Sequence, residues 1–493
     1  MNKKSNSYKE TFSFTIINYI GIVIGIFATL FLFPNNKEAI GVVRFVEGIA
    51  YILYPIFVFG TSQALINFNP KVNAQSKQKL FIYSFYTIFF ISLFFLVIFS
   101  VASFLGLFNN SKIIFYSFAI AFCMAILELF KKKATIANRI TIPTLFDTLV
   151  PKIALATLFY FLLIHQLDLN QLLSFYVSVF VFVLLSVGLY LKKYFQKLFI
   201  KDFKSLFAEV SKKEYFNFSL YAFAGSLGTI FALRMDSIMI PLFLSMEDNG
   251  NFSIAVSLVS ALAVPANGIF ALYSPIISKY FSTQNMVELN IKYKEISIFL
   301  FFIGVLIYSC LFLGIENLFL LLPTGKILMN AVPIILILGL TILINMGTGF
   351  NSEIITYSNH YRFNLIAILV LVSLNFVLNI VFLYFLKLGV IAVALSSLIS
   401  MLVFNVLKLV FIYRKFKLFP FDLKYLGLFI TSTSVLAFVY FIPETISIFF
   451  NLVAKVVLCI LLNLVLIYRL NFVIQFNFIL DNFFRKIFKR KQS

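Results

Sequence analysis

The stretch FNFSLYAFAGSLGTIFALRMDSIMIPLFL, from Phe216 to Leu244, decides the fold class. It is apolar over the length of a membrane span, yet it contains Arg234 and Asp236. A charged side chain inside such a span costs about 3 kcal/mol or more, so two of them indicate a functional or strongly paired position. The stretch therefore predicts a membrane protein that holds charge inside the bilayer.

The same stretch repeats the beginning of the chain at one constant offset. The matching residues are Phe12 with Phe216, Phe14 with Phe218, Gly21 with Gly225, and Ile26, Phe27 and Ala28 with Ile230, Phe231 and Ala232. Each copy is followed by an acid-x-x-Gly turn, Glu38 to Gly41 and Glu247 to Gly250. This echo predicts a parallel repeat, in which two six-helix lobes are related by an axis along the membrane normal.

The composition is that of an all-α, polytopic membrane protein. Hydrophobic residues make up 61% of the chain, charged residues 12%, and the mean hydropathy is +1.01. About 14 spans of roughly 20 residues fit the sequence, each long enough to cross about 30 Å of hydrocarbon. The spans are expected near residues 12–33, 40–61, 80–105, 113–130, 148–165, 171–191, 216–244, 252–277, 296–322, 327–350, 363–386, 389–412, 423–442 and 446–468.

Lysine and arginine are distributed unevenly between the two sets of loops. One set is strongly basic and includes seven lysines between Lys192 and Lys213. The opposite set holds only Lys37, Lys112, Lys326 and Lys387. Because cytoplasmic loops carry the excess of positive charge, both termini are expected in the cytoplasm. The asymmetry accounts for most of the net charge of +21, so no nucleic-acid partner is expected.

The chain divides into five expected regions. Residues 1–191 form the first six-helix lobe and residues 216–418 the second. Between them, residues 192–215 repeat Phe, Leu and Lys at helical spacing, which predicts an amphipathic helix on the inner leaflet that attracts anionic phospholipid. Residues 419–470 add two further spans. Residues 471–493 form a basic, amphipathic cytoplasmic tail.

No motif in the sequence indicates an enzyme, a metal site or a cofactor. The two histidines, His165 and His360, are expected on opposite sides of the membrane. The chain has no HExxH, no paired-cysteine motif, no glycine-rich phosphate loop and no DxD pair. Cys123, Cys310 and Cys459 lie inside spans, where we expect them to fill the core. A scaffold for glycan-assembly enzymes and a membrane-embedded glycan-processing enzyme are the least favoured alternatives.

The charges inside the spans are the candidate site. Arg44 and Glu47 are three residues apart, so they share a helix face and can pair. Arg234 and Asp236 point to nearly opposite sides of their helix, and Arg234 lies about 15 Å from the outer end at Leu244. A wet cavity would accommodate such a side chain. Arg44 and Arg234 are therefore candidate substrate-binding residues, and Asp236 and Glu47 candidate ion-coupling residues. The alternative for each is a buried structural pair.

Four further polar residues lie near the second lobe. Lys455 is deep in the last span, where it either snorkels to the lipid headgroups or faces a groove as a third substrate-binding residue. Lys408 lies one turn from the inner boundary, and we expect it to snorkel. Asn351 and Glu353, near the inner end of the tenth span, are candidate polar cavity residues. The alternative for Glu353 is a position among the headgroups.

Four segments carry a resemblance to a known family. They are NNKEAIGVVRFVEGIAYILYPIFVFGTSQALINFNPK (Asn35 to Lys71), LRMDSIMI (Leu233 to Ile240) with NGNFSIAVSLVSALAVP behind it, GTGFNSEIITYSNHYRFN (Gly347 to Asn364) and LGVIAVALSSLIS (Leu388 to Ser400). Together, in this order and with this number of spans, they resemble O-antigen-type polysaccharide flippases. That family belongs to the multidrug/oligosaccharidyl-lipid/polysaccharide exporter superfamily.

The resemblance implies a V-shaped, two-lobe transporter, working as a monomer by alternating access. It implies an undecaprenyl-pyrophosphate-linked oligosaccharide as cargo, moved from the inner to the outer leaflet of a bacterial cytoplasmic membrane, beside a glycan polymerase and other assembly proteins. The alternatives are a proton- or sodium-coupled small-molecule exporter, with Asp236 and Glu47 as ion sites, and a lipid II flippase. Lipid II flippases carry several arginines on the first span, whereas this first span has none, which argues against lipid II.

Overall fold

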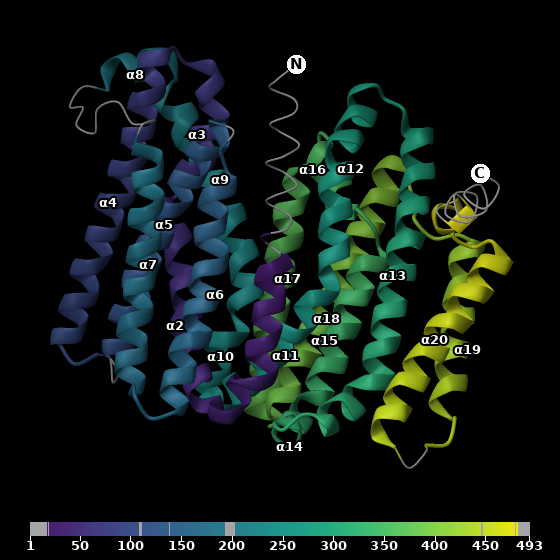
Figure 1. Ribbon diagram of the computed structural model, residues 1–493. Helices are drawn as coiled ribbons and strands as arrows, with labels where there is room; N and C mark the ends of the chain where they lie inside the picture. Colours follow the sequence, from purple (N-terminus) through teal and green to yellow (C-terminus); the bar gives the residue numbers. More distant parts are fainter. Residues whose placement is uncertain are drawn as a thin grey trace, which may run out of the picture. The chain divides into compact units, whose positions relative to one another are not determined.

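A computed structural model gives the fold of the chain (Figure 1). It describes residues 17, 19–107, 111–137, 139–192, 203–444, 447–478 and 480–481. Every regular element of these residues is helical, as the composition predicts. The chain separates into two compact units, Met1–Ser253 and Ile254–Ser493, each of which is described by itself below.

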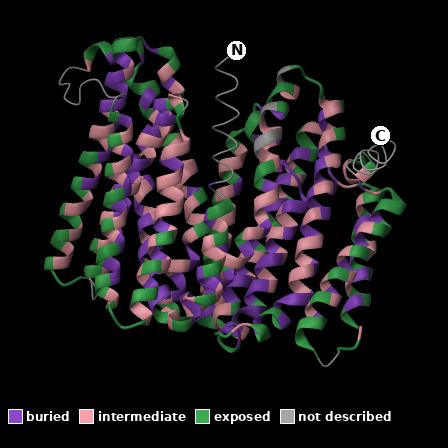
Figure 2. Cartoon of the chain, in the orientation of Figure 1, coloured by how far each residue is buried: buried purple, intermediate pink, exposed green. Residues whose placement is uncertain are grey.

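Unit 1 holds the helices up to the start of the eighth span. They are an apolar first helix (Tyr19–Phe31), η1 (Phe33–Asn36), α2 (Lys37–Val58), α3 (Thr61–Phe68), η2 (Asn69–Lys71), α4 (Ala74–Phe104), α5 (Ser111–Ile136), α6 (Thr141–Leu163), α7 (Leu169–Leu191), α8 (Lys204–Glu209), α9 (Lys212–Arg234), α10 (Asp236–Phe243) and the first part of α11 (Met246–Val259). Among its spans, α2 is the most deeply buried, while α4 and α9 are the least (Figure 2).

Unit 2 holds the remaining helices. They are η4 (Ser260–Ala263), α12 (Val264–Ser282), α13 (Met286–Leu321), α14 (Gly325–Leu328), η5 (Met329–Ala331), α15 (Val332–Gly347), α16 (Asn351–Tyr357), α17 (Arg362–Ile380), the π-helical η6 (Val381–Phe385), α18 (Val390–Phe416), α19 (Leu423–Tyr440) and α20 (Ile448–Leu470). The long α13 is central, because it packs against α12, α15, α19 and α20. Leu452 and Val456 of α20 pack directly on Gly314 of α13.

Thirteen helices of the described residues are long and apolar enough to cross a membrane. The first of the expected spans, residues 12–33, is represented by the shorter apolar helix Tyr19–Phe31, and its beginning lies outside the described residues. The order of the spans agrees with the sequence analysis. Several ends do not: α5 continues to Ile136, and α6 begins at Thr141, seven residues before the expected start.

The division between the units falls at Ser253, later than the expected lobe boundary at residue 215. The reason is that α9 packs closely on α2 and α3. Gly60, in the left-handed region at φ 70°, lies against the backbone of Ser219 and Phe223, where a Cβ would not fit. The Gln63 side chain donates a hydrogen bond to Ser226 Oγ at 2.9 Å. The seventh span is thereby held within unit 1.

The two acid-x-x-Gly turns of the internal echo pack on each other. A Cβ at Gly41 would overlap the carbonyl of Met246, and a Cβ at Gly250 would overlap the carbonyl of Lys37. The Asn249 side chain also donates to the Gly41 carbonyl at 2.8 Å. The contact is reciprocal, since each glycine meets the residue four positions before the other glycine. Reciprocity of this kind is what a twofold relation between two copies of a motif produces.

The linker helix expected over residues 192–215 is wrong as a single element. Its first part lies outside the described residues. The remainder contains the six-residue α8, which ends at an extended Val210 before α9 begins. Leu206 and Val210 are buried in protein. Glu209 accepts hydrogen bonds from Ser76 Oγ and from the Asn73 backbone, which lower the pKa of its carboxyl. The described part of the expected apolar face, at α8, therefore packs against α4.

Candidate functional site

The candidate site of unit 1 is built on one face of α2. Arg44, Glu47 and Tyr51 follow one another at spacings of three and four residues, so they form a stripe along the helix. The helix begins sharply because Asn36 caps it, accepting a hydrogen bond from the Ala39 amide at 3.0 Å. The stripe lies on the most deeply buried span of the unit, so its polar groups require partners inside the protein.

Arg44 and Glu47 form the ion pair that their spacing predicts. Arg44 Nη1 lies 2.6 Å from Glu47 Oε2. The other carboxylate oxygen accepts a hydrogen bond from the Tyr176 hydroxyl of α7, also at 2.6 Å. Glu47 is only 6% exposed and Tyr176 only 3%. Because both of its oxygens are occupied, Glu47 is firmly fixed between α2 and α7.

Arg234 meets the same stripe from α9. Its guanidinium lies over the Tyr51 ring, 4.0 Å from the centroid, and interacts electrostatically with Glu47. The expected span 216–244 is helical almost throughout, as α9 and α10, and it bends at Met235, whose dihedral angles stay helical (φ −57°, ψ −39°). Asp236, the first residue of α10, is 8% exposed. Pro241 within α10 removes a further backbone donor. Arg234 therefore lies directly before the bend, on a helix that packs beside α2.

Lys152 of α6 is a third cation near this stripe, and the sequence analysis did not single it out. It is half-buried, and Arg44 is the charged group with which it interacts. The expected span began at residue 148, only four residues before Lys152. Since α6 begins at Thr141, Lys152 lies midway along the helix. The Pro151-Lys152 pair inside an apolar segment was the available signal.

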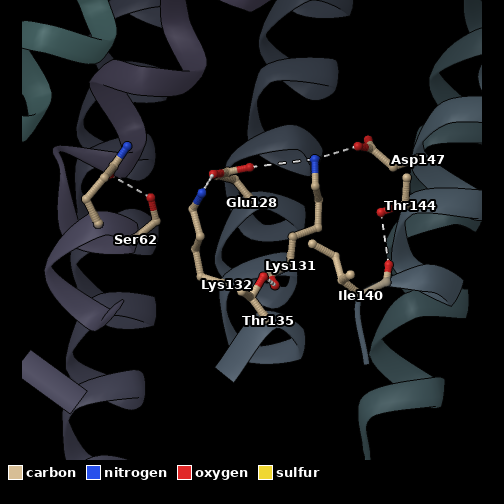
Figure 3. Close-up of polar contacts among 9 residues, drawn as sticks. Ser62, Glu128, Lys131, Lys132, Thr135, Ile140, Thr144 and Asp147 are labelled. Carbon is tan, nitrogen blue, oxygen red and sulfur yellow. Dashed lines mark hydrogen bonds and ion pairs between the residues drawn. The ribbon is translucent and has the colours of Figure 1, made fainter. Parts of the chain in front are cut away.

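A second charged group in unit 1 joins α5 to α6 (Figure 3). Lys131 Nζ lies 2.7 Å from Asp147 and 3.8 Å from Glu128, and Lys132 Nζ lies 2.9 Å from the other oxygen of Glu128. The span expected over residues 113–130 ended just before these lysines. They belong to α5 because that helix is longer than expected. Two cations and two carboxylates balance one another, so this group offers no surplus charge to a ligand.

The polar centre of unit 2 surrounds the break between α15 and α16. Gly349 has φ 67° there, and its Cα packs against Ser297, which leaves no space for a side chain. Asn351 is 2% exposed, and its amide donates to Asn405 Oδ1 at 2.9 Å and to Thr348 Oγ1 at 3.1 Å. The structure thus gives Asn351 a role in joining α16 to α18. Its neighbour Glu353 is half-buried, and burial raises the pKa of its carboxyl.

Lys408 does not snorkel as expected. It is 1% exposed, its ammonium donates to Ser352 Oγ at 2.6 Å, and it lies 3.7 Å from the centroid of the Phe404 ring. Glu353 is the charged group with which it interacts. The expectation failed because α18 is packed against α15, α16 and α17, which leaves the side chain enclosed by protein.

Lys455 lies on α20, 8% exposed, with its ammonium 3.1 Å from Glu444 in the turn after α19. The ion pair fixes Lys455 within the C-terminal hairpin. Among the described residues, no three His, Cys, Asp or Glu side chains gather in an arrangement that could hold a metal ion. The structure therefore brings Arg44, Glu47, Arg234 and Tyr51 together in unit 1, and keeps Asn351 and Glu353 together in unit 2.

Solved structures of transporters share this fold. The lipid II flippase MurJ in an inward closed conformation is similar over 92% of this chain and 98% of its own, with a TM-score of 0.70 and 16% identity. An inward-facing multidrug resistance MATE family transporter of the MOP superfamily matches over 82% and 94%, with a TM-score of 0.61 and 14% identity. A MOP superfamily transporter from Pyrococcus furiosus matches over 82% and 95%, with a TM-score of 0.53 and 12% identity.

The sequence itself matches no protein-family model and no curated protein. At these low identities, the similarity to solved structures establishes the fold. The function has to be inferred from the chemistry of the site.

Proposed function

We propose that this protein is a flippase that moves an undecaprenyl-pyrophosphate-linked oligosaccharide from the inner to the outer leaflet of a bacterial cytoplasmic membrane. One observation carries the proposal. Arg44, Lys152 and Arg234 gather around α2 inside the membrane-spanning part of unit 1, against the two carboxylates Glu47 and Asp236. Three cations against two carboxylates leave net positive charge at membrane depth, which suits an anionic cargo.

The chemistry of the cargo fits this charge. A pyrophosphate and a polar glycan do not cross hydrocarbon unaided, because both would lose their hydration. Arginine and lysine inside a protected cavity replace that hydration with charge-assisted hydrogen bonds, and guanidinium can contact two phosphate oxygens at once. The lipid tail remains in the bilayer while the headgroup passes through the protein. Alternating access would deliver the headgroup to the opposite leaflet.

The proposal extends to the surroundings of the protein. Both termini lie in the cytoplasm, as the distribution of basic loops favours. Anionic phospholipid contacts the basic inner surface, the protein works as a monomer, and a glycan polymerase receives the delivered cargo. No nucleic acid and no cofactor take part in this function.

Two alternatives share the fold. Lipid II also carries a pyrophosphate on a polyprenyl chain, and the similarity to a lipid II flippase keeps it as a second cargo. A proton- or sodium-coupled exporter would use Asp236 as an ion site, since that carboxylate is buried next to the bend in the seventh span. Glu47 suits this role less well, because Arg44 and Tyr176 already occupy both of its oxygens.

The test uses the full chain reconstituted in vesicles with a fluorescent undecaprenyl-pyrophosphate trisaccharide. A membrane-impermeant quencher reports how much label reaches the outer leaflet. We expect transport by the wild type, partial transport by Arg234→Lys, and a roughly tenfold to hundredfold loss per folded molecule in Arg234→Ala. Full transport by Arg234→Ala would remove Arg234 from the cargo site. A matched arm with lipid II decides between the two lipid cargoes, and a failure in both arms would reject the flippase.

A further inference from the structure

We infer that a polar cavity at one end of unit 1 is a binding site for the hydroxyl groups of a glycan. The cavity lies between η1 and the turn that joins α6 to α7, and its volume is about 860 Å³. Ligand pockets commonly measure roughly 300–1,000 Å³, so the cavity has the size of a ligand site. The inference rests on the proposed function for the source of the glycan, and it adds a site that contacts the sugars of the cargo and not its phosphates.

The lining of the cavity is polar but carries little charge. Three leucines supply its apolar part, and the residues with polar side chains are Asn35, Asn36, His165, Gln166, Asp168 and Gln171. Among the described residues that line the cavity, none is a lysine or an arginine, and Asp168 alone has a carboxylate. A pyrophosphate would therefore find no counter-charge here. A neutral ligand rich in hydroxyl groups would find both hydrogen-bond donors and acceptors.

The two walls of the cavity are fixed to each other. η1 packs against α6, where the rings of Phe33 and Phe159 meet edge to face with their centroids 5.1 Å apart. Both rings are buried. The chain leaves α6 through His165, whose φ of 59° is left-handed, and the Gln166 amide donates to the Phe161 carbonyl at 3.0 Å. Since the cavity is preformed, a ligand has little of the protein to order when it binds.

Four of the polar side chains are held at one end only. Asn35 Nδ2 donates to a carbonyl of the first helix at 2.7 Å, and Asn36 Oδ1 caps α2. Asp168 Oδ1 accepts from the Gln171 amide at 2.7 Å, and Gln171 Oε1 accepts from the Asp168 amide at 2.9 Å. Within the described part of the chain, no hydrogen bond reaches the opposite ends of these side chains, which are Asn35 Oδ1, Asn36 Nδ2, Asp168 Oδ2 and Gln171 Nε2.

These four ends make sugar hydroxyls the matching ligand class. They are two acceptors and two donors, and each hydroxyl group of a sugar can both donate and accept. The leucines of the lining offer an apolar surface to the C–H groups of a sugar ring. The side chains are also oriented before binding, because each is fixed at its other end.

The position of the cavity suits a glycan that has been delivered. The turn between α6 and α7 belongs to the loops that are poor in lysine and arginine, which are expected on the outer side of the membrane. On α2, Arg44 follows Asn36 by eight residues, which is about 12 Å along the helix. A short oligosaccharide can bridge that separation, so a cargo whose pyrophosphate is near Arg44 can place its sugars in the cavity.

The first experiment locates the glycan on the wild-type protein. The detergent-solubilised full chain is irradiated with an undecaprenyl-pyrophosphate trisaccharide whose terminal sugar carries a diazirine, and the labelled peptides are identified by mass spectrometry. We expect the label in residues 35–36 and 162–171. A parallel arm uses the free trisaccharide with the same diazirine. Labelling of the cavity by the lipid-linked probe alone identifies the cargo as the source, and labelling by both identifies glycans in general as ligands. Labelling of these residues by neither probe overturns the site.

The second experiment measures binding by native mass spectrometry in variants that keep the helix caps. Asn36→Ser retains a capping oxygen for α2 but removes the Nδ2 donor. Gln171→Glu retains the capping box of α7 but replaces the Nε2 donor with an oxygen. Each variant should bind the lipid-linked trisaccharide roughly twofold to tenfold more weakly, because each loses about one hydrogen bond. Both should bind undecaprenyl pyrophosphate, which has no sugar, like the wild type.

Asn285→Ser is the matched control for Asn36→Ser. Asn285 caps α13 in unit 2 in the same way, accepting from the Glu288 amide at 3.1 Å, and it does not line the cavity. We expect this variant to bind the lipid-linked trisaccharide like the wild type. An equal loss in Asn285→Ser and Asn36→Ser would overturn the inference, because it would trace the loss to a weakened cap.

Equal affinity of the wild type, Asn36→Ser and Gln171→Glu for the lipid-linked trisaccharide also overturns the inference. That result would leave transport in vesicles to be judged separately, so the proposed function can stand without the glycan site. Conversely, labelling of the cavity in a protein that moves neither lipid cargo would support the glycan site and reject the flippase.

Discussion

Lys152 in unit 1 and Lys408 in unit 2 are both lysines of membrane-spanning helices, but their surroundings differ. Lys408 is fully enclosed: Ser352 accepts its hydrogen bond, Phe404 lies against its ammonium, and Glu353 supplies nearby negative charge. Lys152 is half-exposed, and the charged group that acts on it is another cation. Burial alone therefore does not mark a ligand site. Under the proposed function, a cation whose charge the protein leaves uncompensated is the better candidate for binding the cargo.

The same contrast applies to the aromatic contacts of the two units. Arg234 lies on the ring of Tyr51 in unit 1, and Lys408 lies on the ring of Phe404 in unit 2. In unit 1 the ring supports a half-buried cation beside the α2 stripe. In unit 2 the ring is part of a closed polar centre that joins α16 to α18. The first arrangement suits a binding site and the second a structural contact.

The largest effect should come from breaking the buried pair of unit 1. Glu47→Gln leaves the Arg44 guanidinium without its carboxylate, and breaking such a pair typically costs about 3–5 kcal/mol. We expect a large loss of folded protein, measured as the fraction that survives heating in detergent. Glu214→Gln is the control, because Glu214 pairs with Lys71 where both side chains are more than half exposed. That pair should contribute at most about 1 kcal/mol. Equal losses in both variants would contradict the expectation.

The enclosed lysine of unit 2 should be replaceable by an apolar residue. Lys408→Met keeps much of the side-chain volume and removes a buried charge, and the nearby Glu353, whose pKa burial already raises, can take up a proton once the lysine is gone. We expect unfolding in detergent at the wild-type temperature or above, with transport retained. A folded Lys408→Met protein without transport would show that the two lysines do not differ as described, and that unit 2 also takes part in binding.

Removing the aromatic ring beside each cation, one variant at a time, sharpens the comparison further. Tyr51→Leu removes the face beneath Arg234, an interaction of roughly 0.5–2 kcal/mol, and should reduce transport more than stability. Tyr51→Phe retains the face and should retain transport. Phe404→Leu, the matched change in unit 2, should affect stability and leave transport per folded molecule unchanged. If Tyr51→Leu and Phe404→Leu alter transport equally, the ring beneath Arg234 has no special role.

The smallest effects concern pH. A carboxyl group in each unit should make the stability of the protein depend on pH, and the two dependences should have opposite signs. Burial raises the pKa of Glu353 above its ordinary value of 4.5. The folded state therefore holds that proton more tightly, and stability falls as pH rises from 4.5 through the raised value, by at most about 1.4 kcal/mol per pH unit. Glu353→Gln should remove this slope.

In unit 1, hydrogen bonds from Ser76 and Asn73 lower the pKa of Glu209, so the stability that its carboxylate contributes is lost as pH falls. Glu209→Gln should remove that opposite slope. Unfolding midpoints across the pH range measure both, and slopes of the same sign would contradict the assignment.

The sequence predicted the parts of the site that depend on local spacing. The span order follows from the lengths of the apolar segments and the Arg44–Glu47 pair from helical spacing, and both are confirmed. The position of Lys152 and the membership of Lys131 in α5 depended on helix ends, which polar residues in the last turns obscure. Local patterns also carry no information about distant partners. The bond from Tyr176 to Glu47 joins residues on two different helices, and periodicity cannot choose that partner.

The enclosure of Lys408 illustrates the same limit. From the sequence, a lysine one turn from the end of a span is expected to reach the headgroups. It can do so only where no neighbouring helix covers it. Here α15, α16 and α17 pack against α18 and cover Lys408. Composition alone therefore cannot distinguish the enclosed Lys408 from the accessible Lys152. The distinction depends on where each helix ends and on which neighbouring helices cover the side chain.

The central claim is that the accessible lysine of unit 1 binds the cargo and the enclosed lysine of unit 2 does not. The most direct test compares Lys152→Gln and Lys408→Met in the same vesicles, with the fluorescent undecaprenyl-pyrophosphate trisaccharide, as transport per folded molecule. We predict that Lys152→Gln loses most of the transport, by roughly tenfold or more, while Lys408→Met stays close to the wild type. Normal transport by Lys152→Gln, or an equal loss in both variants, would contradict the claim.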